Sequence, residues 1–148
     1  MPTHSIAIGS AVTAGFAGGL QLAVNGAFGR RIGVLEAACF ASIVTVITLT
    51  TITLAARGGL GGVAHGLRLP PWLWLGGLCS AVLITCVTYS SARIGGLGTG
   101  ALLIAGQLCV VVLADTFGWF GLQRITLTPQ RMAGLPLLVV AAFLVLKR

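Results

Sequence analysis

The sequence predicts an all-α membrane protein with five transmembrane helices, and three observations support this. First, 57% of the 148 residues are hydrophobic, only 7% are charged, and the mean hydropathy is +1.05; a soluble domain needs more charge on its surface. Second, uncharged or nearly uncharged runs of about the 20 residues that cross a bilayer fill most of the chain. Third, the nine Lys and Arg residues stand singly or in pairs at the ends of these runs, where membrane proteins place charge.

The predicted spans form a single domain over residues 1–148, and they are about 5–28, 32–56, 71–92, 94–114 and 129–146. The first contains no charged residue and is too long for the apolar core of a signal peptide. The second contains one charge, Glu36, about a turn from its start. Transmembrane β-strands would appear as runs of about ten alternating residues, so these runs are predicted to be helices. After the second span, five glycines between residues 58 and 66 predict a flexible loop.

The three later spans have clear boundaries. Pro71 and Pro129 suit the first positions of the third and fifth helices, where a missing N–H has no partner to lose. Trp72 and Trp74 begin the third span, and such amphipathic rings prefer the membrane interface. Residues 93–96 (Arg-Ile-Gly-Gly) leave room only for a tight turn, so the third and fourth spans are predicted to be antiparallel neighbours.

The cations show almost no preference for either side of the membrane. Five spans would place the two termini on opposite sides, and this assigns each connection to one side. The N-terminal side then holds Arg57, Arg68, Arg124 and Arg131, and the other side holds Arg30, Arg31, Arg93, Lys147 and Arg148. With the α-amino group, the two sides are equal. A protein with one fixed orientation usually shows a clear bias. The balance therefore predicts insertion in both orientations and pairing with an inverted copy; the alternative is one orientation set by its context.

Small residues predict where the helices touch. Gly15 and Gly19 form a GxxxG pair in the first span, and Gly96 and Gly100 form another in the fourth. Such pairs let helix backbones approach closely in lipid.

Polar side chains within apolar spans are costly, so each has a functional or a structural reason. Gln21 and Asn25 lie four residues apart and form a polar stripe on the first helix. They either contact a substrate in a central cavity or bond to another helix. Tyr89 and Gln107 are further candidates for lining this cavity, although the hydroxyl groups near Tyr89 could instead bond to backbone carbonyls.

Glu36 is one of only two acidic residues in the chain. It begins the second helix, where the helix dipole favours a carboxylate. Arg30 and Arg31 are close enough in the sequence to pair with it. Glu36 is therefore either an interfacial acid neutralised by these arginines or a coupling site for transport.

Asp115 is the other acidic residue, and it ends the fourth helix, where the dipole disfavours a negative charge. It shares a helix face with Gln107. Arg124 or Arg131 could pair with it, and Arg131, in the first turn of the fifth helix, would also gain from a pair. The functional alternative is a carboxylate that takes up a proton or a cationic substrate.

Several classes of function find no support. The basic residues form no cluster, so nucleic acid is not an expected partner despite the net charge of +7. The sequence has no Ser/His/Asp set, no Walker loop and no Cys/His spacing for a metal, so we expect no enzyme, cofactor or metal. The four cysteines all lie inside apolar runs, where thiols pack as small apolar groups.

A set of short motifs, in this order and spacing, resembles a known family. They are Gln21 with Asn25-Gly26, Glu36-Ala37-Ala38, residues 71–77 (PWLWLGG), Gly106-Gln107-Leu108, residues 115–118 (DTFG), and Arg131 with Gly134. The chain resembles the YdcZ-type (DUF606) proteins of the drug/metabolite transporter superfamily over nearly its whole length. It departs from them at Thr116, where many relatives have histidine, and at Thr45, where they often have glycine.

The resemblance implies a multi-pass protein of the bacterial inner membrane, equivalent to half of a ten-helix inverted-repeat transporter. Two units would assemble antiparallel, with a site near the midplane. We therefore predict a secondary-active exporter of a small organic molecule that works by alternating access as an antiparallel homodimer, with protons as a possible coupling ion. Its partners would be membrane lipid, a second copy and the substrate. The alternatives are an obligate heterodimer with a paralogous chain, a non-transporting subunit, and a passive channel.

Overall fold

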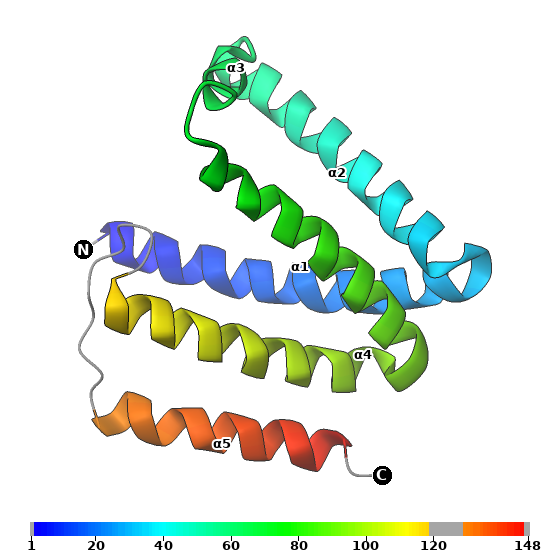
Figure 1. Cartoon of the computed structure of the whole chain (residues 1–148), viewed down its shortest axis with the longest axis vertical. Helices are drawn as coiled ribbons and strands as arrows, with labels where there is room; N and C mark the ends of the chain where they lie inside the picture. Colours follow the sequence, from blue (N-terminus) through cyan, green and yellow to red (C-terminus); the bar gives the residue numbers. More distant parts are fainter. Residues whose placement is uncertain (1, 119–128, 147–148) are drawn as a thin grey trace. The chain divides into compact units, whose positions relative to one another are not determined.

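The computed structural model describes residues 2–118 and 129–146, and these are helical over most of their length (Figure 1). The elements are α1 (Pro2–Ile32), α2 (Val34–Arg57), α3 (Gly61–Gly66), the 3-10 helix η1 (Pro71–Trp74), α4 (Leu75–Phe117) and α5 (Pro129–Leu146). No strand occurs in the described residues. The predicted all-α class is confirmed for this part of the chain.

Three helical segments of the described chain are long and apolar enough to cross a membrane: His4–Ile32, Val34–Arg57 and Pro71–Phe117. The last contains α4, whose 43 residues are roughly twice the 20 that one crossing needs. Gly95, at φ 81° and ψ 166°, interrupts the helical backbone of α4 at the predicted turn. The division of the chain into five spans remains a prediction.

Gly33 separates α1 from α2, and its φ of 104° lies in the region that favours glycine. Its N–H still donates to the Gly29 carbonyl at 3.2 Å, and its carbonyl accepts from the Ala37 N–H at 3.1 Å. Backbone hydrogen bonding thus continues through the turn. One residue therefore suffices to connect the two helices, since α1 ends at Ile32 and α2 begins at Val34.

Gly58 ends α2 in the left-handed conformation (φ 68°, ψ 8°) and donates its N–H to the Leu54 carbonyl. The flexible loop predicted over residues 58–66 is wrong in its second half, where Gly61–Gly66 forms α3. The Ala64 N–H donates to the Leu60 carbonyl at 3.0 Å, and the Arg68 N–H donates to the His65 carbonyl at 2.9 Å. These local bonds outweigh the low helix propensity of the glycines.

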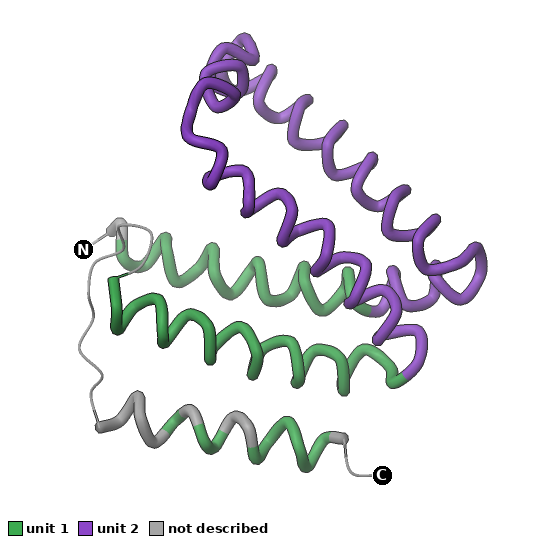
Figure 2. The backbone as a smooth tube through the Cα atoms, in the orientation of Figure 1, with its two compact units in different colours: residues 1–22, 94–148 green, residues 23–93 purple. Residues whose placement is uncertain are grey.

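The chain divides into two compact units (Figure 2). Unit 2 is the continuous stretch Ala23–Arg93, with the end of α1, all of α2, α3 and η1, and the part of α4 up to Arg93, called here its first arm. Unit 1 comprises Met1–Leu22 and Ile94–Arg148, with the start of α1, the part of α4 from Ile94 onward, called its second arm, and α5.

Side-chain burial is inverted relative to a soluble protein. Among the residues whose burial the structure describes, the buried apolar ones are few and mostly small, whereas large ones such as Phe16 and Leu97 are more than 70% exposed. Lipid tails are as apolar as leucine, so large side chains gain little by leaving them, while small residues let helices pack closely. This pattern suits helices surrounded by lipid.

Candidate functional site

In unit 2, the last turns of α1 cross the first arm of α4 at very short range. A Cβ atom added to Gly26 would lie 2.7 Å from the Ser91 Cβ and 3.0 Å from its carbonyl carbon. One added to Gly29 would lie 2.8 Å from the Thr88 methyl carbon. Only glycine permits this approach. Gly26 and Gly29 are three residues apart, as are Thr88 and Ser91, so each pair lies on one helix face.

Two polar side chains are buried at this crossing without a hydrogen-bond partner. Asn25 is 5% exposed and Ser91 is 2% exposed. The Asn25 Nδ2 and the Ser91 Oγ are both buried and unpaired within the described chain. Buried polar groups are nearly always paired, and each unpaired one costs about 1–3 kcal/mol. Thr88 differs, because its hydroxyl donates to the Ile84 carbonyl at 2.7 Å.

Burial divides the polar stripe predicted on α1. Asn25 is buried, whereas Gln21, one turn earlier, is exposed. Among the described residues, neither side chain makes a hydrogen bond to another helix. The two residues are thus free for a further contact, either with a substrate or with a second chain.

Glu36 occupies the first turn of α2, where its carboxylate folds back over Gly33. A carboxylate at this end is stabilised by the helix dipole. Arg30 and Arg31 are exposed in the last turn of α1, where cations suit the dipole. No ion pair joins either arginine to Glu36, although the structure describes all three side chains.

Tyr89 lies on the same arm of α4 as Ser91 but is 52% exposed. The Arg93 guanidinium carbon lies 5.3 Å from the centre of its ring. This distance suits a cation–π contact, which requires less than about 6 Å. Tyr89 therefore holds an arginine at the end of the arm and does not join the buried crossing.

Gln107 lines a shallow hollow of about 760 Å³ along the second arm of α4, in unit 1. The other lining residues are Leu102, Leu103, Ile104, Gly106, Leu108, Val110 and Val111. Gln107 is therefore the polar group in an otherwise apolar surface. Asp115, two turns further along, is half-buried. Its predicted partners, Arg124 and the Arg131 side chain, lie outside the described residues.

The predicted packing glycines differ in what they contact. A Cβ atom on Gly100 would lie 3.2 Å from the Leu22 Cδ1, so this glycine does face α1 within unit 1. Gly96 is half-buried. Atoms added at Gly15 and Gly19 would meet nothing within 4 Å. The first GxxxG pair therefore has no neighbour in the described chain, and a role for it in packing between chains remains a prediction.

Sequence reasoning did not single out Gly26, Gly29 and Ser91 as one site. The signal was present, because Asn25, Gly26 and Gly29 share a face at three- and four-residue spacing. Ile84, Val87, Thr88 and Ser91 share another at the same spacing. Nothing in the spacing alone shows that these two faces meet.

Comparison with known proteins identifies the family. A profile of the family described as "Putative inner membrane exporter, YdcZ" matches residues 6–144. The chain belongs to the YdcZ family. The match includes the crossing of α1 and α4, both acidic residues and the glycine-rich connection after α2. No curated protein and no solved structure matches the chain.

Family membership bears directly on the function. The description of the family is that of a "putative inner membrane exporter", and the long apolar helices described above agree with a membrane protein. In the part of the chain that the structure describes, no three His, Cys, Asp or Glu side chains gather as metal ligands would.

Proposed function

We propose that this YdcZ-family chain is a secondary-active transporter of a small organic molecule, and that it works by alternating access as an antiparallel homodimer of five-span protomers. The sequence feature that carries the proposal is the balance of positive charges, which five spans would divide equally between the two sides. A chain without orientation bias supplies both halves of an inverted repeat from one gene product. The exposed polar groups Gln21 and Gln107 also favour a partner, because lipid offers them no hydrogen bonds.

The substrate contacts that we propose begin at Asn25, with Ser91 added to the set. Both keep a polar atom buried and unpaired, which lowers stability unless a ligand or a moved helix supplies the partner. Gln21, Gln107 and Tyr89 would complete the cavity wall in the dimer. These groups are uncharged, so they would recognise a polar solute by hydrogen bonds.

Glu36 and Asp115 are the proposed coupling sites, because they are the only side chains in the protein that carry a negative charge. In a dimer of identical chains each would occur twice. A passive channel is the competing function, and its flux would not respond to neutralising either acid. An obligate heterodimer would use the same contacts but require a second gene product.

The topology of the intact protein in its membrane tests the proposal. Single cysteines at His4 and Arg148 would be labelled with a membrane-impermeant reagent. The background would lack Cys39, Cys79, Cys86 and Cys109, which are all exposed and unpaired, so their replacement by alanine leaves no cavity.

Partial labelling of each site from both sides is the expected result, because each orientation would contribute about half of the chains. Labelling of each site from one side only would reject the homodimer. The antiparallel partner would then have to be a different chain, as in the heterodimer alternative.

A further inference from the structure

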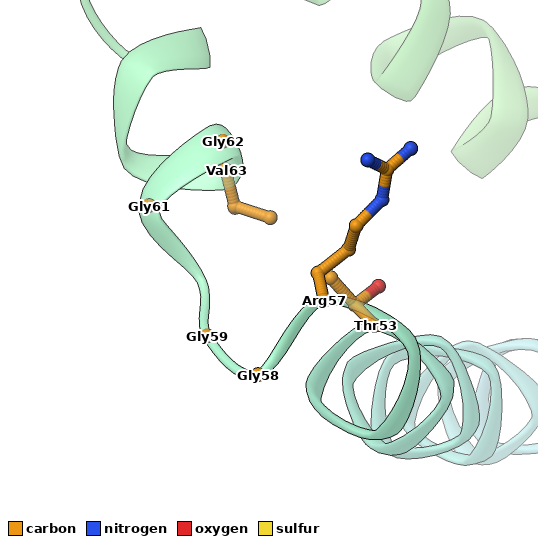
Figure 3. A pocket seen from close by; sticks show the side chains of 7 residues that line it. All are labelled: Thr53, Arg57, Gly58, Gly59, Gly61, Gly62 and Val63. Atoms are coloured by element: carbon orange, nitrogen blue, oxygen red, sulfur yellow. The ribbon is translucent and has the colours of Figure 1, made fainter.

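The connection after α2 forms a hollow of about 550 Å³ that shares no lining residue with the proposed transport contacts (Figure 3). It is lined by Thr53, Arg57, Gly58, Gly59, Gly61, Gly62 and Val63, all within unit 2. Four of the seven are glycines, so much of its wall is bare backbone. Figure 3 shows the Arg57 side chain standing beside the glycine segment, with the Val63 side chain turned toward the same opening.

Arg57 supplies an unneutralised positive charge to this hollow. It ends α2, whereas Glu36 begins the same helix, roughly 30 Å away at 1.5 Å per residue. In the described part of the chain, no acidic side chain pairs with Arg57. A guanidinium group presents five N–H donors in a planar fork, which matches the oxygens of a phosphate.

The length of α2 places the hollow at the level of lipid headgroups. A helix of 24 residues is about 36 Å long, which exceeds the roughly 30 Å of the hydrocarbon core. When α2 crosses the bilayer, its last turn therefore reaches the headgroup region. Exposed apolar side chains follow along the same connection, as expected at an interface: Leu60, Val63, Leu67, Leu69, Trp72 and Trp74.

We propose that this hollow binds the phosphate of an anionic phospholipid, with Arg57 as its principal ligand and the exposed apolar side chains beside the acyl chains. A zwitterionic lipid fits less well, because its own cation would lie against a protein of net charge +7. The proposal depends on α2 spanning the membrane and does not depend on transport.

Native mass spectrometry of the full-length protein in detergent tests the site, by titration with dioleoyl phosphatidylglycerol or with dioleoyl phosphatidylcholine. Arg57→Gln should weaken phosphatidylglycerol binding about fivefold, the loss expected for one basic residue at an anionic surface. The matched control is Arg68→Gln, which removes the same charge from the same connection but outside the hollow. It should leave binding unchanged.

Any of three results would overturn the proposal at this stage. Equal binding by the wild type and Arg57→Gln would show that the hollow is not a site. Equal weakening by Arg57→Gln and Arg68→Gln would indicate diffuse attraction to the basic connection. A parallel titration with inorganic phosphate distinguishes the source of the anion: competition at millimolar phosphate would assign the site to a soluble phosphate and reject the lipid.

A second pair of variants keeps every charge, and so tests the site even if Arg57→Gln does not fold. Gly62→Leu adds a side chain to the wall of the hollow, and Gly66→Leu adds one outside it. A Cβ atom at either position meets nothing within 4 Å, so both variants should fold. Gly62→Leu should weaken phosphatidylglycerol binding several-fold and Gly66→Leu should not; equal binding by the two would contradict the proposal.

Discussion

Ser91 keeps a hydroxyl group in the short contact between α1 and α4, where the described chain gives it no partner. Replacing Ser91 by alanine removes the buried polar atom without enlarging the side chain. We expect the free energy of unfolding in detergent to stay constant or rise by up to about 1–3 kcal/mol, the cost of an unpaired buried group. Thr88→Ala is the control, and it should destabilise because it removes a methyl group packed beside Gly29.

If Ser91 binds a substrate, its replacement will affect the unfolding free energy and the transport rate in opposite directions. Ser91→Ala would then fold at least as well as the wild type and transport less. A clear loss of stability would instead mean that the hydroxyl is paired in the membrane, and the proposed role of Ser91 would fail.

Gly26 and Gly9 make a matched pair on α1. A Cβ atom at Gly26 would press on Ser91, whereas one at Gly9 would meet nothing within 4 Å. Gly26→Ala should therefore lower the unfolding free energy by about 1–3 kcal/mol, as overpacking does. Gly9→Ala should be neutral or slightly stabilising, because alanine favours a helix. Both can be compared by thermal unfolding of the purified protein; equal effects would mean that the short contact at Gly26 is not formed.

Asp115→Asn removes one negative charge from the second arm of α4 while keeping the size of the side chain. If Asp115 is a coupling site, the variant should fold, bind substrate and lose proton-driven uptake into vesicles, because an amide cannot carry the proton. Failure to fold would favour the structural pair with an arginine. Unchanged proton-driven flux would remove Asp115 from the coupling mechanism.

At the scale of elements, the break in α4 is the feature most sensitive to one residue. Gly95 has φ 81° and ψ 166°, a conformation available essentially to glycine alone. Gly95→Ala should cost about 1–3 kcal/mol of unfolding free energy or straighten the helix through the break. Gly106→Ala is the control within α4, since its Cβ would meet nothing. Thermal unfolding of the two purified variants compares them; equal stability would show that the break tolerates a side chain.

The helices could be predicted from the sequence more fully than the site could. Length and hydropathy place the long helices, and the Gly-Gly pair after Arg93 places the break, because these are local properties. The helix at Gly61–Gly66 was missed, since its glycines oppose helix formation and only hydrogen bonds such as Ala64 to Leu60 reveal it. Asn25 was identified as a polar group in an apolar helix. The meeting of Asn25 and Ser91 at one crossing depends on which helix faces pack together. The spacing of residues in the sequence does not contain this long-range information.

At the scale of the whole molecule, the charge balance is the property to perturb. Replacing Lys147 and Arg148 by glutamine, or appending two lysines after Arg148, should bias insertion in opposite directions. Each variant alone should then label from one side and lose transport, and co-expression of the two should restore it. Transport by either variant alone, with one fixed orientation, would show that inverted copies are not required. Neither change touches the sites at Asn25 or Arg57.

The division into two units has a consequence for the order of synthesis. Unit 2 is one uninterrupted stretch, Ala23–Arg93, whereas unit 1 is assembled from the two ends of the chain. At translation rates of 5–20 residues per second, everything after Arg93 takes roughly 3 to 11 s to emerge. During those seconds all residues of unit 2 have already been synthesised, including Gly26 and Ser91, which form the short contact. The first 22 residues cannot complete unit 1 until the segment after Arg93 has been synthesised.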